Sequence, residues 1–428
     1  MVDFYKSIQL KVKNNIIYIV FCLFVLASLT SIKCFPGPST VIGILYRTAV
    51  AALSIFCSSI LIPVLDFKHR RYIFVLLITS VLFFVISIFT GIIWIDETNH
   101  IKTLFAFDNL GRNIALVTLL VSYYFCFSSI TKKATLFFLL GTIAYAFFAS
   151  ILGLILDYND FVNVLIDKEG QNFDFDSFFL TKNYFGIIIS FGLISLSMIP
   201  RFFQKNKLLF YSADIVISLF LFFVLIVTRA KTSIFLIIIF YSVFLFFVLK
   251  NKKKLLLYFI VLFSLILIFV LWYFVPQIYS LFPFSNKFHH FLQHTLIEDS
   301  AVVFKSRFEN WLSFFSNFSW KTTLGVGDRS FYYLLKQDIH ITSLDNAYLT
   351  FLGQGGIFKI AIFIITNQVI LFCVKKERAY YSETLLLFIV FLGYGLFLDF
   401  SFNSLSFESY AFVGLIAVCN KKPIQTNP

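Results

Sequence analysis

The sequence predicts an all-α integral membrane protein with about twelve transmembrane helices and one long helical loop. Hydrophobic residues make up 59% of the chain and charged residues only 13%, against about 25% charged residues in soluble proteins. The apolar residues form runs of roughly 17 to 25 residues, long enough to cross a hydrocarbon core of about 30 Å as helices. The six cysteines show no paired spacing, so no disulfide framework is predicted.

Each predicted span is an apolar run that ends at polar or charged residues. The first follows three lysines, as in a signal peptide, but no small-residue cleavage site comes after it, so we expect a retained helix. No repeat or linker divides the chain, and residues 1–428 are predicted to form a single membrane domain. The predicted spans are 15–32, 41–63, 72–95, 110–130, 134–156, 184–200, 208–228, 232–249, 255–275, 356–374, 384–400 and 406–419, the last being short.

Positive charge is concentrated in alternate loops. With the N-terminus inside, the inner segments hold basic clusters at Lys68–Arg71, Lys132–Lys133, Lys250–Lys254 and Lys375–Arg378. Cytoplasmic loops retain Lys and Arg, so both termini are predicted to be cytoplasmic. The net charge of +13 therefore indicates membrane topology, and no nucleic-acid partner is expected.

Two of the predicted outer loops are long. Residues 157–183 are rich in acidic side chains, and residues 276–355 form the longest loop, which combines charges, Trp and Gly-x-Gly in an otherwise apolar chain. Long loops in compact proteins are usually functional. We expect the large loop, 276–355, to carry the active site.

Arg229 and Lys231 lie in the sequence VTRAKTS, at a predicted tight outer turn between two spans. Two cations there depart from the inside bias and suit an anionic head group such as a pyrophosphate, which Arg binds bidentately. The alternative is a pair of side chains that reach lipid phosphates. Arg47, six residues into the second span, is expected to line an outward-facing cavity or else to extend to the outer interface.

Within the long loop, Arg307 and Trp311 begin a predicted amphipathic helix. Its aromatic side, expected at the membrane surface, is predicted to hold Phe308, Trp311, Leu312 and Phe315. Further on, Gly325 and Gly327 predict a tight turn, because Gly permits positive φ.

Asp345 and Asn346 precede Ala347, Tyr348 and Leu349, and either of the two could cap the helix that follows. Capping alone would explain an Asp at this position. The alternative is that the Asp345 carboxylate, beside a cationic cluster, acts as a general base for a hydroxyl group.

Metal binding is not predicted. His290 and His294 are four residues apart but have no obvious third ligand. Asp174 and Asp176 resemble the paired carboxylates of metal-dependent sugar transferases, although their loop is acidic throughout.

Four segments in order resemble the bacterial O-antigen ligases and the Wzy-type O-antigen or exopolysaccharide polymerases. They are TRAKTS at 228–233, Arg307 with Trp311, LGVG at 324–327, and DNAYL from 345 through to the Gly pair at 355–356. The resemblance covers roughly residues 180 to 360. It implies a GT-C-like, metal-independent, inverting glycosyltransferase without cofactors, in the bacterial inner membrane, with its active site at the periplasmic face.

The resemblance also implies substrates, partners and roles. The substrates are oligosaccharides on undecaprenyl pyrophosphate; the partners are membrane lipids and the chain-length regulator and flippase of the same pathway. Arg229 and Arg307 would stabilise the pyrophosphate leaving group, and Lys231, Arg47, Trp311, Asn346 and Tyr348 are expected to bind substrate. Ligases carry His immediately before the Asn of the last motif; Asp345 stands there in this chain, which favours a polymerase with Asp345 as the base.

Two alternatives stay open at this point. One is a ligase that transfers polysaccharide to lipid A-core. The other, from a different class, is a flippase or transporter of lipid-linked sugars. A transporter would be expected to show paired repeats and charges deep in several helices, whereas the polar residues here are concentrated at the predicted outer surface.

The topology is directly testable. Reporters placed after Pro428 or within residues 132–133 and 250–254 should read cytoplasmic, and reporters near Asn172 or Asn317 should read external, because of the inside bias of Lys and Arg. A cytoplasmic reading at Asn317 would contradict the assignment of the long loop to an outer active site.

Overall fold

A computed structural model of the chain is helical almost throughout its described part. The residues described are 2–29, 32–33, 41–61, 74, 78, 132–166, 175, 177, 179, 181–199, 207–228, 230–249, 299–316, 323, 325, 344, 346–353 and short stretches of 356–415. Over these residues no strand forms beyond one isolated β-bridge, between Ile32 and Phe179. The prediction of an all-α chain is confirmed for this part.

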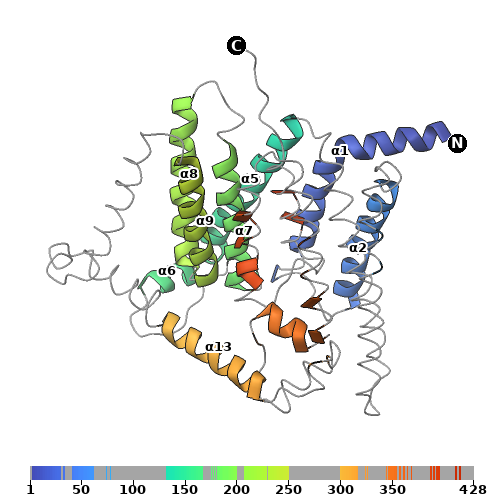
Figure 1. The fold of residues 1–428 in the computed structure, drawn as a ribbon. Helices are drawn as coiled ribbons and strands as arrows, with labels where there is room; N and C mark the ends of the chain where they lie inside the picture. Colours follow the sequence, from blue (N-terminus) through green and yellow to red (C-terminus); the bar gives the residue numbers. More distant parts are fainter. Residues whose placement is uncertain are drawn as a thin grey trace.

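Helices α1, α2, α5, α7, α8 and α9 (Figure 1) coincide with predicted spans to within a few residues, except that α1 begins earlier than expected. Helix α6 and helix α13 lie at the lower end of the bundle in the same view. The bounds are α1 Val2–Leu29, α2 Val41–Leu61, α5 Lys132–Leu156, α6 Tyr158–Ile166, α7 Lys182–Met198, α8 Lys207–Val227, α9 Lys231–Leu249 and α13 Asp299–Ser316.

Membrane-spanning length is met by few of the helices in the described part of the chain. Lys133–Leu156 is long and apolar enough to cross a membrane, and α1 adds a second span if its two parts, bent by 62°, are counted as one. The predicted spans 72–95, 110–130, 255–275, 356–374, 384–400 and 406–419 lie wholly or mostly outside the described residues. The number of about twelve spans therefore stays a prediction.

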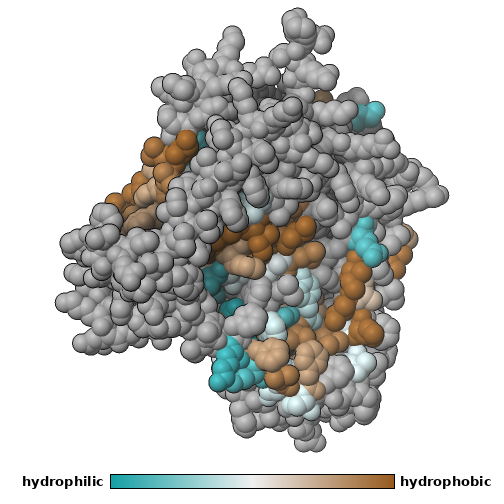
Figure 2. All heavy atoms as spheres, turned by 60° about the vertical axis from the view of Figure 1, so that its left-hand side comes forward, coloured by the Kyte–Doolittle hydropathy of each residue, from teal (hydrophilic) through white to brown (hydrophobic). Residues whose placement is uncertain are grey.

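Large apolar side chains also cover outward-facing surface. Figure 2 shows hydrophobic surface, in brown, over described helices, with hydrophilic patches beside it. Exposed examples on α2, α5 and α8 are Leu45, Phe56, Phe148, Leu152, Ile215, Val216 and Leu219. Such surface is expected where helices face lipid.

Helix α7 is the centre of the bundle. It begins after Thr181, whose hydroxyl accepts a hydrogen bond from the backbone N–H of Tyr184, and it is buried on nearly all sides from Phe185 to Met198. A helix that is apolar all round is one surrounded by others. Helices α5, α8 and α9 pack against it.

Small residues let α7 and α9 approach closely. A Cβ added to Gly186 would lie 2.5 Å from the Ala230 Cβ and 2.9 Å from the Ser233 Oγ. Ala230 and Ser233 belong to the TRAKTS segment, and both are buried. The contact therefore fixes the start of α9 against α7, as small residues do where membrane helices meet.

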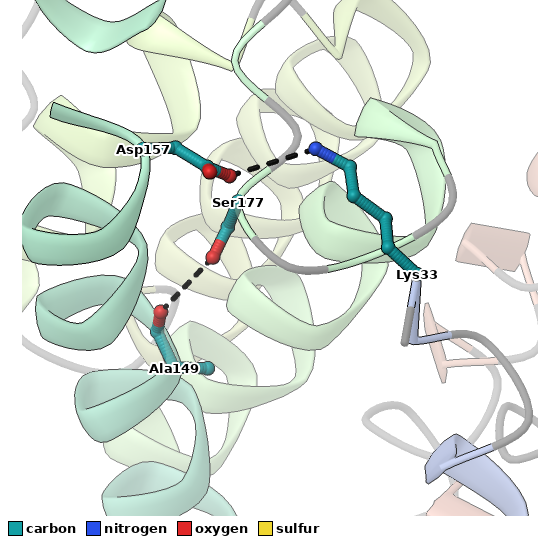
Figure 3. A network of polar contacts seen from close by, with 4 residues as sticks. All are labelled: Lys33, Ala149, Asp157 and Ser177. Carbon is teal, nitrogen blue, oxygen red and sulfur yellow. Dashed lines mark hydrogen bonds and ion pairs between the residues drawn. The ribbon is translucent and has the colours of Figure 1, made fainter. Parts of the chain in front are cut away.

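Loops from three parts of the chain meet at one end of the bundle. Lys33 Nζ lies 3.5 Å from Asp157 Oδ2, and Ser177 Oγ donates to the Ala149 carbonyl at 3.5 Å (Figure 3). Ser177 has a φ of 57°, in the left-handed region. The predicted topology places all these loops on the same side of the membrane, and α13 lies at this same end in Figure 1.

Gly186 supplies a stability test. Replacing Gly186 by Ala should lower stability by about 1 to 3 kcal/mol, the range for overpacking a close-packed site, because the new methyl overlaps the Ala230 Cβ. Thermal unfolding of the purified protein measures the loss. The double variant G186A/A230G removes that overlap and should recover part of the loss; a double variant no more stable than G186A would contradict the contact.

Candidate functional site

Helix α13 has two sides with different environments. Arg307, Trp311 and Phe314, spaced by four and three residues, form its inner side: Phe314 is 1% exposed, and Arg307 and Trp311 are half-buried. The outer side carries Phe308, Leu312 and Phe315, each about half exposed. The predicted amphipathic helix is confirmed, but it begins at Asp299 and not at Arg307. The placement of Trp311 with Phe308, Leu312 and Phe315 is wrong, since its indole N–H is bonded within the protein.

The Trp311 indole connects α13 to the last motif. Its Nε1–H donates a hydrogen bond of 2.8 Å to the carbonyl of Leu344, which is fully buried. Leu344 directly precedes Asp345 in the chain. Two predicted site elements that are 33 residues apart are thereby brought together, the helix of Arg307 and the segment that begins at Leu344.

Asn346 caps the helix of residues 347–353. Its Oδ1 accepts hydrogen bonds of 3.0 Å from the backbone N–H groups of both Tyr348 and Leu349, and its side chain is almost fully buried. This is the geometry of an N-cap, in which a side-chain oxygen satisfies otherwise unpaired N–H groups. Of the two capping candidates, Asn346 therefore has this role. Asp345 itself lies outside the described residues.

Tyr348 also makes a contact within the protein. Its Oη donates to the Leu392 carbonyl at 2.7 Å, and a Cβ added to Gly395 would lie 3.2 Å from that oxygen. Burial raises the pKa of Tyr348 to about 12, so the phenol stays protonated near neutral pH and remains a donor. The ring thereby joins the capped helix to the segment around Leu392.

The turn between α8 and α9 is organised by Thr228. Its Oγ1 donates to the Leu225 carbonyl at 2.7 Å and accepts from the Ala230 N–H at 3.3 Å. Lys231 is the first residue of α9 and is half-buried. A helix N-terminus carries a partial positive charge that adds to the attraction of a nearby Lys for anions. Arg229, between Thr228 and Ala230, lies outside the described residues.

Other predicted residues are placed only in part. Gly325 has a φ of 88°, which confirms the positive φ expected at the first glycine of the LGVG turn. Arg47 lies in α2, but its side chain is outside the described part of the structure, as are His290, His294, Asp174 and Asp176. Among the residues that are described, no three His, Cys, Asp or Glu side chains gather as metal ligands.

Residues 216–364 match a family model described as O-antigen ligase. This segment is similar to that family, and the predicted resemblance to the O-antigen polymerase and ligase family is confirmed. Members of that family are membrane-embedded, glycosyltransferase-like enzymes. No curated protein and no solved structure matches the chain significantly.

The O-antigen ligase segment begins within α8 and continues past the capped helix. It therefore contains the Thr228 turn, Arg307, Trp311 and the residues from Leu344 to Tyr348, and it leaves Arg47 outside. Two contacts that sequence reasoning missed, those of Gly186 and Leu392, lie outside the segment. For Gly186, the sequence indicated a close helix contact only through a small residue about one turn after the Thr181 cap. Leu392 contributes a backbone carbonyl, and such a contact leaves no pattern in the sequence.

The N-cap role of Asn346 predicts how the stability of the protein changes with the residue at this position. Replacement by Ala should cost about 0.5 to 2 kcal/mol of stability, whereas Asp or Ser, which rank beside Asn as N-caps, should be nearly neutral. Thermal unfolding of the purified variants measures this. Equal stability of N346A and wild type would show that the two hydrogen bonds to Oδ1 do not stabilise the helix.

Proposed function

We propose that this protein is an O-antigen or exopolysaccharide polymerase, which joins oligosaccharide repeat units carried on undecaprenyl pyrophosphate at the periplasmic face of the bacterial inner membrane. The family match supports an enzyme of the polymerase and ligase type. The observation that carries the proposal is the cap: Asn346 has the structural role, so capping gives no reason for a carboxylate at Asp345. Asp345 stands where the ligases carry His.

In the proposed reaction a hydroxyl oxygen of the incoming repeat unit attacks the anomeric carbon of the growing chain. Asp345 accepts the hydroxyl proton as the new C–O bond forms. The bond from the anomeric carbon to the lipid pyrophosphate breaks, and the pyrophosphate leaves with the electron pair. A single displacement of this kind inverts the anomeric configuration.

Negative charge develops on the leaving pyrophosphate, and we assign its stabilisation to Arg229 and Arg307. Guanidinium groups pair with phosphate oxygens bidentately, and a donor placed in advance where charge develops is usually the largest single catalytic contribution. The half-buried position of Arg307 on the inner side of α13 supports this role. Lys231 at the start of α9, and Arg47, are proposed to bind the donor before reaction.

The second candidate is a ligase that transfers the polysaccharide to lipid A-core. The description of the matched family as O-antigen ligase favours it, and it would use the same leaving group with a different acceptor. Transport of lipid-linked sugars has no support from the comparisons.

Deleting the gene and running the surface polysaccharide on a gel tests the proposal. Loss of the ladder with one repeat unit retained on the core indicates the polymerase. Loss of every repeat unit indicates the ligase. An unchanged ladder would contradict both.

The proposed roles of Arg229 and Arg307 can be tested by substitutions that remove the charge or change its geometry. R229A and R307A should each abolish the ladder at normal protein level, and Lys at either position should restore only part of it, because an ammonium is a point charge without a planar fork. The matched control is K305A, which removes a largely exposed cation from the same helix. Normal ladders from both Ala variants would rule out the assigned roles.

Substitutions at Asp345 test its role as the base, and a substitution at the neighbouring Asn346 serves as the control. D345N keeps the side-chain shape and removes the proton acceptor, so its rate should fall by about 10²- to 10⁴-fold; N346D keeps the cap and should stay active. D345H, which recreates the ligase residue, should retain some activity. A normal rate in D345N would reduce Asp345 to a structural residue.

A further inference from the structure

We infer that Trp311 is a positioning residue: its hydrogen bond to Leu344 aligns the segment of Asp345 with the helix that carries Arg307. The inference rests on the proposed function. It differs from the expectation that Trp311 binds substrate, because the single indole donor is used within the protein.

The residues on both sides of Asp345 are held, each by a different contact. The preceding Leu344 is fully buried, and its carbonyl accepts the Trp311 N–H at 2.8 Å. The following Asn346 is held by its cap, and the Tyr348 hydroxyl anchors the first turn of the capped helix to Leu392. On the Leu344 side, Trp311 is the contact that reaches from α13.

Trp311 also affects the position of Arg307, because both residues lie on the inner side of α13. The two residues are one turn apart, about 6 Å along the helix axis, and Phe314 on the same side is buried. One hydrogen bond therefore sets the distance between a helix that carries a proposed phosphate ligand and a segment that carries the proposed base.

Trp suits this position for a physical reason. An indole N–H can only donate, and the rigid ring has two rotatable bonds, so the direction of donation is well defined. A buried carbonyl without a donor is costly, and the segment is expected to move to find one. Small displacements of a reacting group reduce catalysis strongly, even when substrate binding is unchanged.

The test replaces only the indole N–H of Trp311. Amber suppression at position 311 introduces 3-benzothienylalanine, in which sulfur replaces the indole N–H, and 5-fluorotryptophan, which keeps the N–H, is the matched control. The purified full-length protein is assayed with lipid-linked repeat units extracted from cells that lack this gene. We expect kcat to fall by about two- to tenfold with 3-benzothienylalanine, the range for one lost hydrogen bond, with KM unchanged and the control close to wild type.

Several outcomes would overturn the inference. A rise in KM at constant kcat would place Trp311 in contact with substrate, and an unchanged kcat would show that the hydrogen bond does not align the site. If the isostere fails to fold, W311F is measured in the same way, and the split between kcat and KM decides. The proposed function fails separately, when gene deletion leaves the ladder unchanged; a lost ladder with a fully active isostere overturns the inference alone.

Discussion

The close approach of α7 and α9 is the constraint on which the rest of the described structure depends. Lipid tails are as apolar as the side chains of the bundle, so helices associate through packing and hydrogen bonds more than through a hydrophobic force. Gly186 against Ala230 supplies that packing. Because Ala230 directly precedes the first residue of α9, the same contact that stabilises the bundle determines where α9 starts and where Lys231 lies.

Hydroxyl groups extend this principle across the bundle. In the described interior, Ser and Tyr side chains join helices that are distant in the sequence: Ser28 to Tyr145, Ser54 to Tyr410 and Ser190 to Tyr394. A polar group in an apolar interior is costly unless it is hydrogen-bonded. These pairs therefore favour one arrangement of helices over others with equal apolar burial.

The candidate site also depends on hydrogen bonds within the protein. Trp311, Asn346 and Tyr348 were all expected to bind substrate, and each makes a hydrogen bond to the protein backbone. These contacts hold Leu344 and Asn346, the residues on either side of Asp345 in the chain. A short polar motif in such a protein can thus owe its residue types to the support of one functional side chain as much as to contact with ligand.

The sequence by itself determined the helical fold of the described part, the approximate limits of six helices, the helix of Arg307 and the resemblance to the O-antigen polymerase and ligase family, because apolar run length, helical periodicity and motif order are local properties. It could not determine which side of α13 faces inward, whether Asp345 or Asn346 caps the helix, or which carbonyl Trp311 reaches. Asp and Asn are equivalent as caps in isolation, and a backbone carbonyl is the same at every residue. Only the tertiary structure decides among them, because it brings Leu344 to Trp311 and Leu392 to Tyr348.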